Sequence, residues 1–98
     1  LGLPFNIASS SLLLYITAHL CELVPRFLYL TLGDVHIYEA HIPMCKEQID
    51  RSMFIFPTLE IEENTQLTSV ADIQDLKFEN FILHNYLHHP EIKAEIII

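Results

Sequence analysis

The stretch Leu1-Gly2-Leu3-Pro4-Phe5-Asn6-Ile7-Ala8-Ser9 decides how this chain is organised, because a long apolar helical pattern follows it directly. Gly2 and Pro4 interrupt a short apolar run, which is typical of an extended segment or a tight loop. Asn6 precedes a helix expected over residues 7–23, and its side-chain oxygen suits the N-cap position. Gly2 lacks a Cβ and would let a ligand approach the backbone closely. Two interpretations follow: an amide that binds a ligand at the mouth of a buried helix, or a plain junction with a capping Asn.

The expected helix over residues 7–23 has apolar side chains on nearly every side, which favours a central helix buried all round. Pro25 is expected to end it. The apolar stretch within it is interrupted by His19 and Glu22 and is shorter than the roughly 20 residues that span a bilayer. We therefore expect a core helix and no membrane association. The apolar positions at helical spacing are Leu12, Leu13, Ile16, Leu20 and Leu23.

Residues 27–38 have the composition of a β-strand with an interruption at Gly33-Asp34, which predicts a bulge or kink. His36 and Tyr38 are two residues apart, so on a strand both side chains project from one face. That face is either a half-exposed surface or a hydrogen-bonding edge for a polar ligand.

Four further elements follow the same reasoning. Residues 41–51 are expected to form a short helix and residues 58–62 a strand. Ser69 with Asp72 three residues later resembles a capping box and predicts a short helix that ends near residue 75. The alternation in residues 92–96 predicts a last strand.

Length and composition limit the chain to one domain at most. Of its 98 residues 51% are hydrophobic, and the mean hydropathy of +0.32 is high for a free-standing domain of this size. We therefore expect burial against the rest of a larger fold or against a partner. The chain does not begin with Met and opens inside a motif, which we interpret as a piece of a longer polypeptide.

Charge and cysteine usage narrow the classes of function. Five basic against thirteen acidic side chains give a net charge of −8, which argues against nucleic-acid binding. Cys21 and Cys45 have no spacing signature, so free thiols in a reducing compartment are expected. Neighbouring His88 and His89 diverge on an extended chain and make a poor chelate, so no metal site is predicted.

Three strings resemble the thymidylate synthase family: residues 1–9, the string Leu32-Gly33-Asp34-Val35-His36-Ile37-Tyr38, and residues 86–98 with His89-Pro90 and Ile92-Lys93. The resemblance covers the whole chain, residues 1–98, and corresponds to the C-terminal segment of a single thymidylate-synthase-like domain. It implies an α+β fold in which a buried central helix packs on a bulged, mostly antiparallel sheet. It also implies a homodimer formed through that sheet.

The resemblance implies reductive methylation of deoxyuridylate (dUMP) to dTMP. Carried over, Asn6 would hydrogen-bond the N3 and O4 edge of the pyrimidine, since an amide offers one donor group and one acceptor there. His36 and Tyr38 would hold the deoxyribose hydroxyl, and Ser9 would lie near the nucleotide.

The resemblance also implies 5,10-methylenetetrahydrofolate as cofactor. Leu1 and Gly2 would lie near the folate, and Ile98 would belong to the tail that closes over it and excludes water. The nucleophilic cysteine of the family lies in an upstream Pro-Cys-His string that does not occur here, and neither Cys21 nor Cys45 aligns with it. We therefore expect no catalytic residue in this chain and no turnover by it alone.

The expected partners are the remainder of the synthase domain, a second copy, and dUMP, with dihydrofolate reductase as a fusion partner in a bifunctional enzyme. The expected location is the cytoplasm or the mitochondrial matrix, not the secreted space. The alternative is a non-catalytic, synthase-derived subunit of a larger assembly. Departures from the family pattern favour this alternative; they include Ser10, Ala40, residues 25–27 and residues 51–55.

Overall fold

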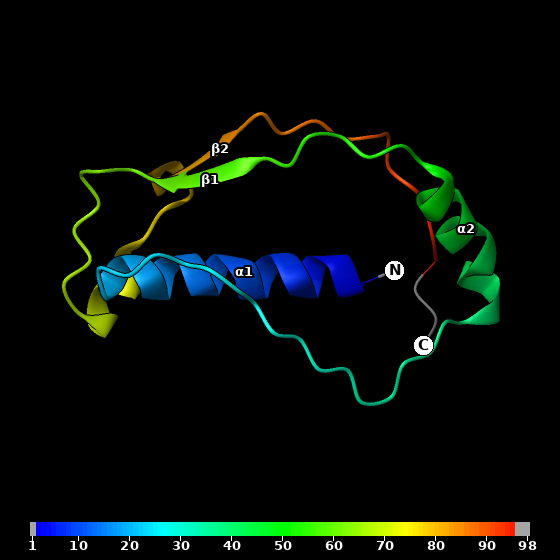
Figure 1. The fold of residues 1–98 in the computed structure, drawn as a ribbon, viewed down its shortest axis with the longest axis horizontal. Helices are drawn as coiled ribbons and strands as arrows, with labels where there is room; N and C mark the ends of the chain where they lie inside the picture. The colour runs from blue at the N-terminus through cyan, green and yellow to red at the C-terminus, as the bar shows by residue number, and fades with distance from the viewer. Residues whose placement is uncertain (1, 96–98) are drawn as a thin grey trace.

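The computed structural model describes residues 2–95 and contains both helices and a small antiparallel sheet, consistent with the α+β class. In Figure 1 the long helix α1 crosses the middle of the molecule, with the two strands on one side and an extended segment on the other. Helix α2 lies beyond the N-terminal end of α1. The regular elements are α1 (Leu3–Leu20), α2 (Ile42–Asp50), β1 (Thr58–Ile61) and β2 (Phe81–His84). Three short 3-10 helices are η1 (Glu39–His41), η2 (Val70–Asp75) and η3 (Phe78–Asn80).

Helix α1 begins at Leu3, four residues before the predicted start. Pro4 is tolerated because the first-turn N–H groups of a helix have no partner within the helix in any case. Gly2 is the N-cap residue, and the N–H of Asn6 donates to the carbonyl of Gly2 at 3.3 Å. The prediction that Asn6 caps the helix is therefore wrong. The side-chain amide of Asn6 therefore lies within the first turns of the helix and caps none of its N–H groups.

The C-terminal end of α1 is a Schellman motif, which stops the helix at Leu20 before Pro25 is reached. The N–H of Leu23 donates to the Ala18 carbonyl at 2.8 Å, and the N–H of Glu22 donates to His19 at 3.1 Å. Glu22 has a positive φ of 55°, which costs a non-glycine residue about 1 kcal/mol. The two recovered carbonyl hydrogen bonds offset that cost.

Helix α1 is not buried all round within this chain, contrary to expectation. Only Ile16 and Ala18 of the helix are buried, and Phe5 keeps 76% of its surface exposed. By length and apolar composition α1 could cross a membrane, but core helices of soluble proteins also pass that test.

The described chain is open. Its radius of gyration is 16.6 Å, whereas a compact domain of about 100 residues has about 13 Å. Its accessible surface of 8795 Å² exceeds by about 3,000 Å² the value expected for a compact monomer of this mass. A surface of that size suits an extensive, obligate interface.

The predicted strand over residues 27–38 is wrong for this chain: the segment is extended and pairs with no strand among residues 2–95. Gly33-Asp34 forms the expected bend. The predicted last strand is likewise absent over residues 92–95, and residue 96 lies outside the described part. A strand needs a neighbour for its N–H and C=O groups, and local pattern cannot supply one.

The three other predicted elements, the helix over residues 41–51, the strand over residues 58–62 and the short helix that ends near residue 75, are confirmed. Helix α2 and strand β1 occur where expected, and β1 pairs with β2 in antiparallel register, Thr58 opposite His84 and Ile61 opposite Phe81. The Asp72 carboxylate accepts hydrogen bonds from the N–H groups of Thr68 and Ser69, both at 2.8 Å, before η2.

Candidate functional site

Because α1 begins at Leu3 and not at residue 7, three predicted site residues lie on one face of the helix. Gly2, Asn6 and Ser9 stand at positions i, i+4 and i+7, and all three are exposed. Gly2 has a φ of −77°, so its backbone does not require glycine, and an added Cβ would meet nothing within 4 Å. The face therefore presents an amide, a hydroxyl and an unobstructed stretch of backbone to whatever covers it.

His36 and Tyr38 meet as predicted, although their segment is not a paired strand. Their ring centroids lie 5.5 Å apart at 75°, an edge-to-face arrangement. His36 Nδ1 is 3.8 Å from Asp34 Oδ1, too far for a hydrogen bond. Tyr38 is 48% exposed. An imidazole and a phenol thus offer hydrogen-bonding groups side by side.

The two groups of predicted residues remain separate. Within residues 2–95 no hydrogen bond joins Asn6 or Ser9 to His36 or Tyr38. The predicted cofactor residues Leu1 and Ile98 lie outside the described residues.

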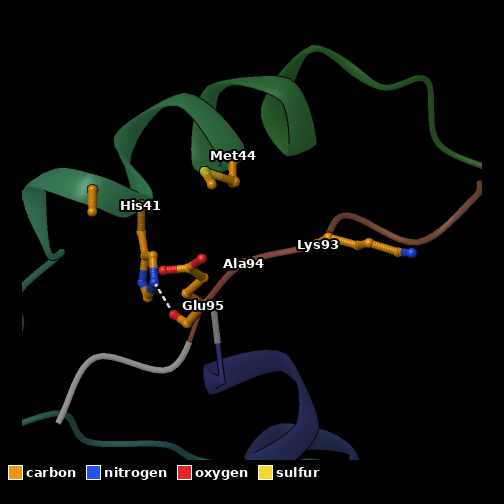
Figure 2. Close-up of a pocket in the computed structure, with 6 residues that line it drawn as sticks. His41, Met44, Lys93, Ala94 and Glu95 are labelled. Atoms are coloured by element: carbon orange, nitrogen blue, oxygen red, sulfur yellow. Dashed lines mark hydrogen bonds between the residues drawn. The ribbon is translucent and has the colours of Figure 1, made fainter.

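His41 connects Tyr38 to the C-terminal segment, which we define as residues 89–95. Its ring lies 5.7 Å from the Tyr38 ring at 86°, and its Nε2 is 2.8 Å from the Glu95 carbonyl oxygen. A carbonyl only accepts, so Nε2 carries the proton. Figure 2 shows His41 reaching from the start of α2 across a pocket of about 470 Å³ that Met44 also lines.

The C-terminal segment is held a second time at the other end of α2. Arg51 Nη1 donates to the Pro90 carbonyl at 2.6 Å, and His89 Nε2 donates to the Ser52 carbonyl at 2.8 Å. Arg51 Nη2 also pairs with Glu47 at 2.6 Å. These reciprocal contacts between residues 51–52 and 89–90 tie the segment to α2.

A larger pocket of about 720 Å³ opens where the start of α1 faces this segment. Gly2 and Pro4 line it from α1, Arg51 from the end of α2, and His89 and Ile92 from the C-terminal segment. The structure therefore brings Gly2, but not Asn6 or Ser9, to the C-terminal segment.

The titratable groups outside these contacts include one carboxyl with a shifted pKa and two free thiols. The backbone N–H groups of Thr68 and then Ser69 lower the pKa of the Asp72 carboxyl, but they belong to the start of η2. Cys21 is an exposed free thiol and Cys45 a half-buried one. In the described part of the chain no three His, Cys, Asp or Glu side chains gather as metal ligands.

Sequence reasoning missed His41, Arg51 and His89 as a group. Each donates to a backbone carbonyl far away in sequence, a contact that no local motif encodes. Arg51 carries a partial signal, since a cation at the end of a helix suits the helix dipole. The adjacent pair His89-Pro90 gives no sign that both residues contact residues 51–52.

These features define an open α+β segment that exposes several polar side chains while much apolar surface stays uncovered. The chain belongs to the thymidylate synthase family, because the family model described as "Thymidylate synthase" matches residues 1–98.

The chain is similar to the thymidylate synthase of Francisella philomiragia, with 46% identity over 99 residues, which cover 100% of this chain and 34% of that protein. It is 45% identical over 98 residues to the thymidylate synthases of saimiriine herpesvirus 2 and varicella-zoster virus, and covers 32% and 31% of them. The chain thus spans about a third of the length of these curated relatives.

Proposed function

We propose that this chain is the C-terminal third of a thymidylate synthase domain that methylates dUMP reductively to dTMP with 5,10-methylenetetrahydrofolate. The observation that carries the proposal is the match of the family over the full chain, together with Gly2, Asn6 and Ser9 on one exposed helix face. Such a face supplies contacts to a ligand without supplying a nucleophile.

Asn6 is the proposed reader of the pyrimidine. Its amide donates through N–H and accepts through its oxygen, which fits the N3–H and O4 edge of uracil and opposes the reversed pattern of cytosine. The helix begins before Asn6, so this amide is not used to cap backbone N–H groups. Ser9 lies one turn further along the same face and is proposed to lie near the nucleotide.

His36 and Tyr38 are the proposed partners of the deoxyribose hydroxyl. Their edge-to-face rings place an imidazole nitrogen and a phenol oxygen near each other on an exposed segment. In the complete domain the apolar residues of segment 27–38 would pair with strands supplied by the remaining two thirds. That pairing would bring the two rings to the face that carries Asn6.

Gly2 and Leu1 are the proposed contacts to the folate, with Ile98 in the tail that closes over it. The pocket that joins Gly2 to the C-terminal segment supports this assignment. When bound, the folate supplies the one-carbon unit and the reducing equivalents. The residues of this chain bind, orient and exclude water.

The remainder of the domain is proposed to supply the nucleophilic thiolate and the phosphate-binding arginines. Its packing on the open surface of this chain, together with a second copy, would bury α1 and complete the thymidylate synthase fold. Free Cys21 and Cys45 support a reducing location, the cytoplasm or the mitochondrial matrix.

A second candidate is a non-catalytic subunit of a larger assembly. The observations that favour it are the departures from the family pattern at Ser10, Ala40, residues 25–27 and residues 51–55.

A chimera separates the two functions. The matching third of the Francisella philomiragia enzyme is replaced by residues 1–98, and dTMP formation is measured with purified protein and by growth of a thymidine-requiring bacterium. We expect turnover within about tenfold of the parent enzyme. A folded chimera that binds dUMP without turnover would favour the structural subunit, and a folded chimera without dUMP binding would refute the proposed site.

A further inference from the structure

We infer that His41 is a positioning residue that couples occupancy of the sugar site to the C-terminal segment, residues 89–95. The inference rests on the proposed function, since it takes His36 and Tyr38 as the sugar-binding pair. It adds a residue to which neither the family resemblance nor the sequence pattern assigned a role.

A continuous series of side-chain contacts joins the two regions. His36 contacts Tyr38 at 5.5 Å, and Tyr38 contacts His41 at 5.7 Å between ring centroids, both edge to face. His41 then donates from Nε2 to the Glu95 carbonyl at 2.8 Å. The ring of Tyr38 packs against both imidazoles. If the Tyr38 ring turns when it binds a hydroxyl, its contact with the His41 ring changes as well.

The backbone between Tyr38 and His41 is short and fixed. The His41 N–H donates to the Tyr38 carbonyl at 2.8 Å across the single turn of η1, and α2 begins at the next residue. Because the two Cα positions are held by this turn, ligand binding acts mainly through side-chain orientation. The half-buried ring of His41 can therefore pass a change in the Tyr38 side chain on to the Glu95 carbonyl.

The two attachments of the C-terminal segment differ in strength. At the far end of α2, Arg51 and His89 make reciprocal hydrogen bonds that include a charged donor. At the near end, the His41 ring makes one hydrogen bond to the Glu95 carbonyl. We therefore expect the C-terminal segment to detach from α2 first at Glu95. Helix α2, nine residues and about 14 Å long, separates this attachment from the one made by Arg51 and His89.

The competing explanation is that His41 holds the segment regardless of the nucleotide. The two explanations differ in linkage: coupling requires that dUMP binding and the His41–Glu95 contact strengthen each other by the same factor. A purely structural contact shows no dependence on dUMP.

The test uses the complete synthase domain that contains residues 1–98. Hydrogen exchange of backbone amides in residues 91–95 is measured with and without dUMP, and the dUMP dissociation constant is measured in parallel. In the wild-type protein we expect dUMP to slow exchange there roughly three- to tenfold, the range for one typical hydrogen bond. In His41→Ala we expect this slowing to vanish and dUMP affinity to fall by the same factor.

Two further variants keep the result interpretable. His41→Gln retains a side-chain N–H and should keep the fold and recover part of the response, which guards against misfolding of His41→Ala. His84→Gln changes a histidine that bonds Glu60 in the sheet at 2.7 Å, and it should respond as wild type.

Unchanged dUMP-dependent slowing in His41→Ala would overturn the coupling and leave the proposed function standing. Wild-type protein that binds dUMP without any change in residues 91–95 would do the same. Failure of the folded wild-type domain to bind dUMP would instead overturn the proposed function, and this inference with it.

Discussion

Helix α1 and the segment of residues 27–38 are both strongly apolar, yet only the helix forms in this chain. A helix satisfies its backbone within itself, and the capping at Gly2 and the Schellman motif after Leu20 complete it locally. A strand depends on N–H and C=O groups of a neighbour. The difference shows which parts of the fold the chain completes by itself and which need hydrogen-bond partners that residues 2–95 do not supply.

The largest expected effect comes from separating the chain from the proposed remainder of the domain. Residues 1–98 alone should aggregate or fail to melt cooperatively, since about 3,000 Å² of excess surface stays uncovered. Circular dichroism should show helical signal without a sharp thermal transition, whereas the chimera should melt cooperatively. A soluble monomer with a sharp melt would contradict the proposal that this surface is an internal interface.

In the complete domain, Tyr38→Phe should weaken dUMP binding roughly ten- to a hundredfold, because a hydroxyl in a closed site loses its partner, which costs about 1–3 kcal/mol. The ring contacts with His36 and His41 are kept, so the melting temperature should barely change. Calorimetric titration of dUMP measures the effect. Tyr29→Phe, which alters an 87% exposed tyrosine of the same segment, is the matched control. Equal affinity in wild type and Tyr38→Phe would refute the sugar contact.

The substitution Asn6→Asp tests the proposed role of helix α1, as Tyr38→Phe tests that of residues 27–38. A carboxyl presents a different set of donors and acceptors to the base, so the preference for dUMP over dCMP should fall by about tenfold. The ratio of kcat/KM for the two nucleotides is the measurement. Ser11→Ala, five residues after Asn6 and therefore about 140° around the helix from it, serves as control. An unchanged ratio in Asn6→Asp would show that Asn6 does not read the base.

The smallest effect is expected far from the site, at Asp72. Hydrogen bonds from Thr68 and Ser69 lower its pKa in the folded protein below that of the unfolded chain, about 3.9. The carboxylate therefore stabilises the fold above that pH, and its contribution is lost as the pH falls through the lowered pKa. Asp72→Asn should lower the melting temperature slightly at pH 7 and less so at pH 3. A difference from wild type that does not shrink on acidification would contradict this.

The sequence predicted those elements whose signals are local. Asp72 and its two N–H donors, helix α2 and strand β1 occur where pattern placed them. Asn6 lies at the predicted end of the helix but does not cap it, because the helix begins at Leu3 and includes Pro4 in its first turn.

The sequence could not predict what depends on distant partners. The edge-to-face contact of His36 and Tyr38 agrees with their spacing, but the strand that should carry them has no neighbour among residues 2–95. The donations of His41, Arg51 and His89 to carbonyls join residues 37 to 54 positions apart. Such contacts follow from the path of the chain in space, which local pattern does not determine.

The carbonyl contacts of the C-terminal segment bear on how this region can evolve. His41 and Arg51 bind the oxygens of Glu95 and Pro90, and every residue type has that oxygen. Apart from His89, whose own ring donates to Ser52, side chains in the segment can therefore change through mutation while its attachment to α2 persists, provided that the backbone keeps its course. Selection is expected to act on the donors, and the segment they hold is free to diverge between lineages.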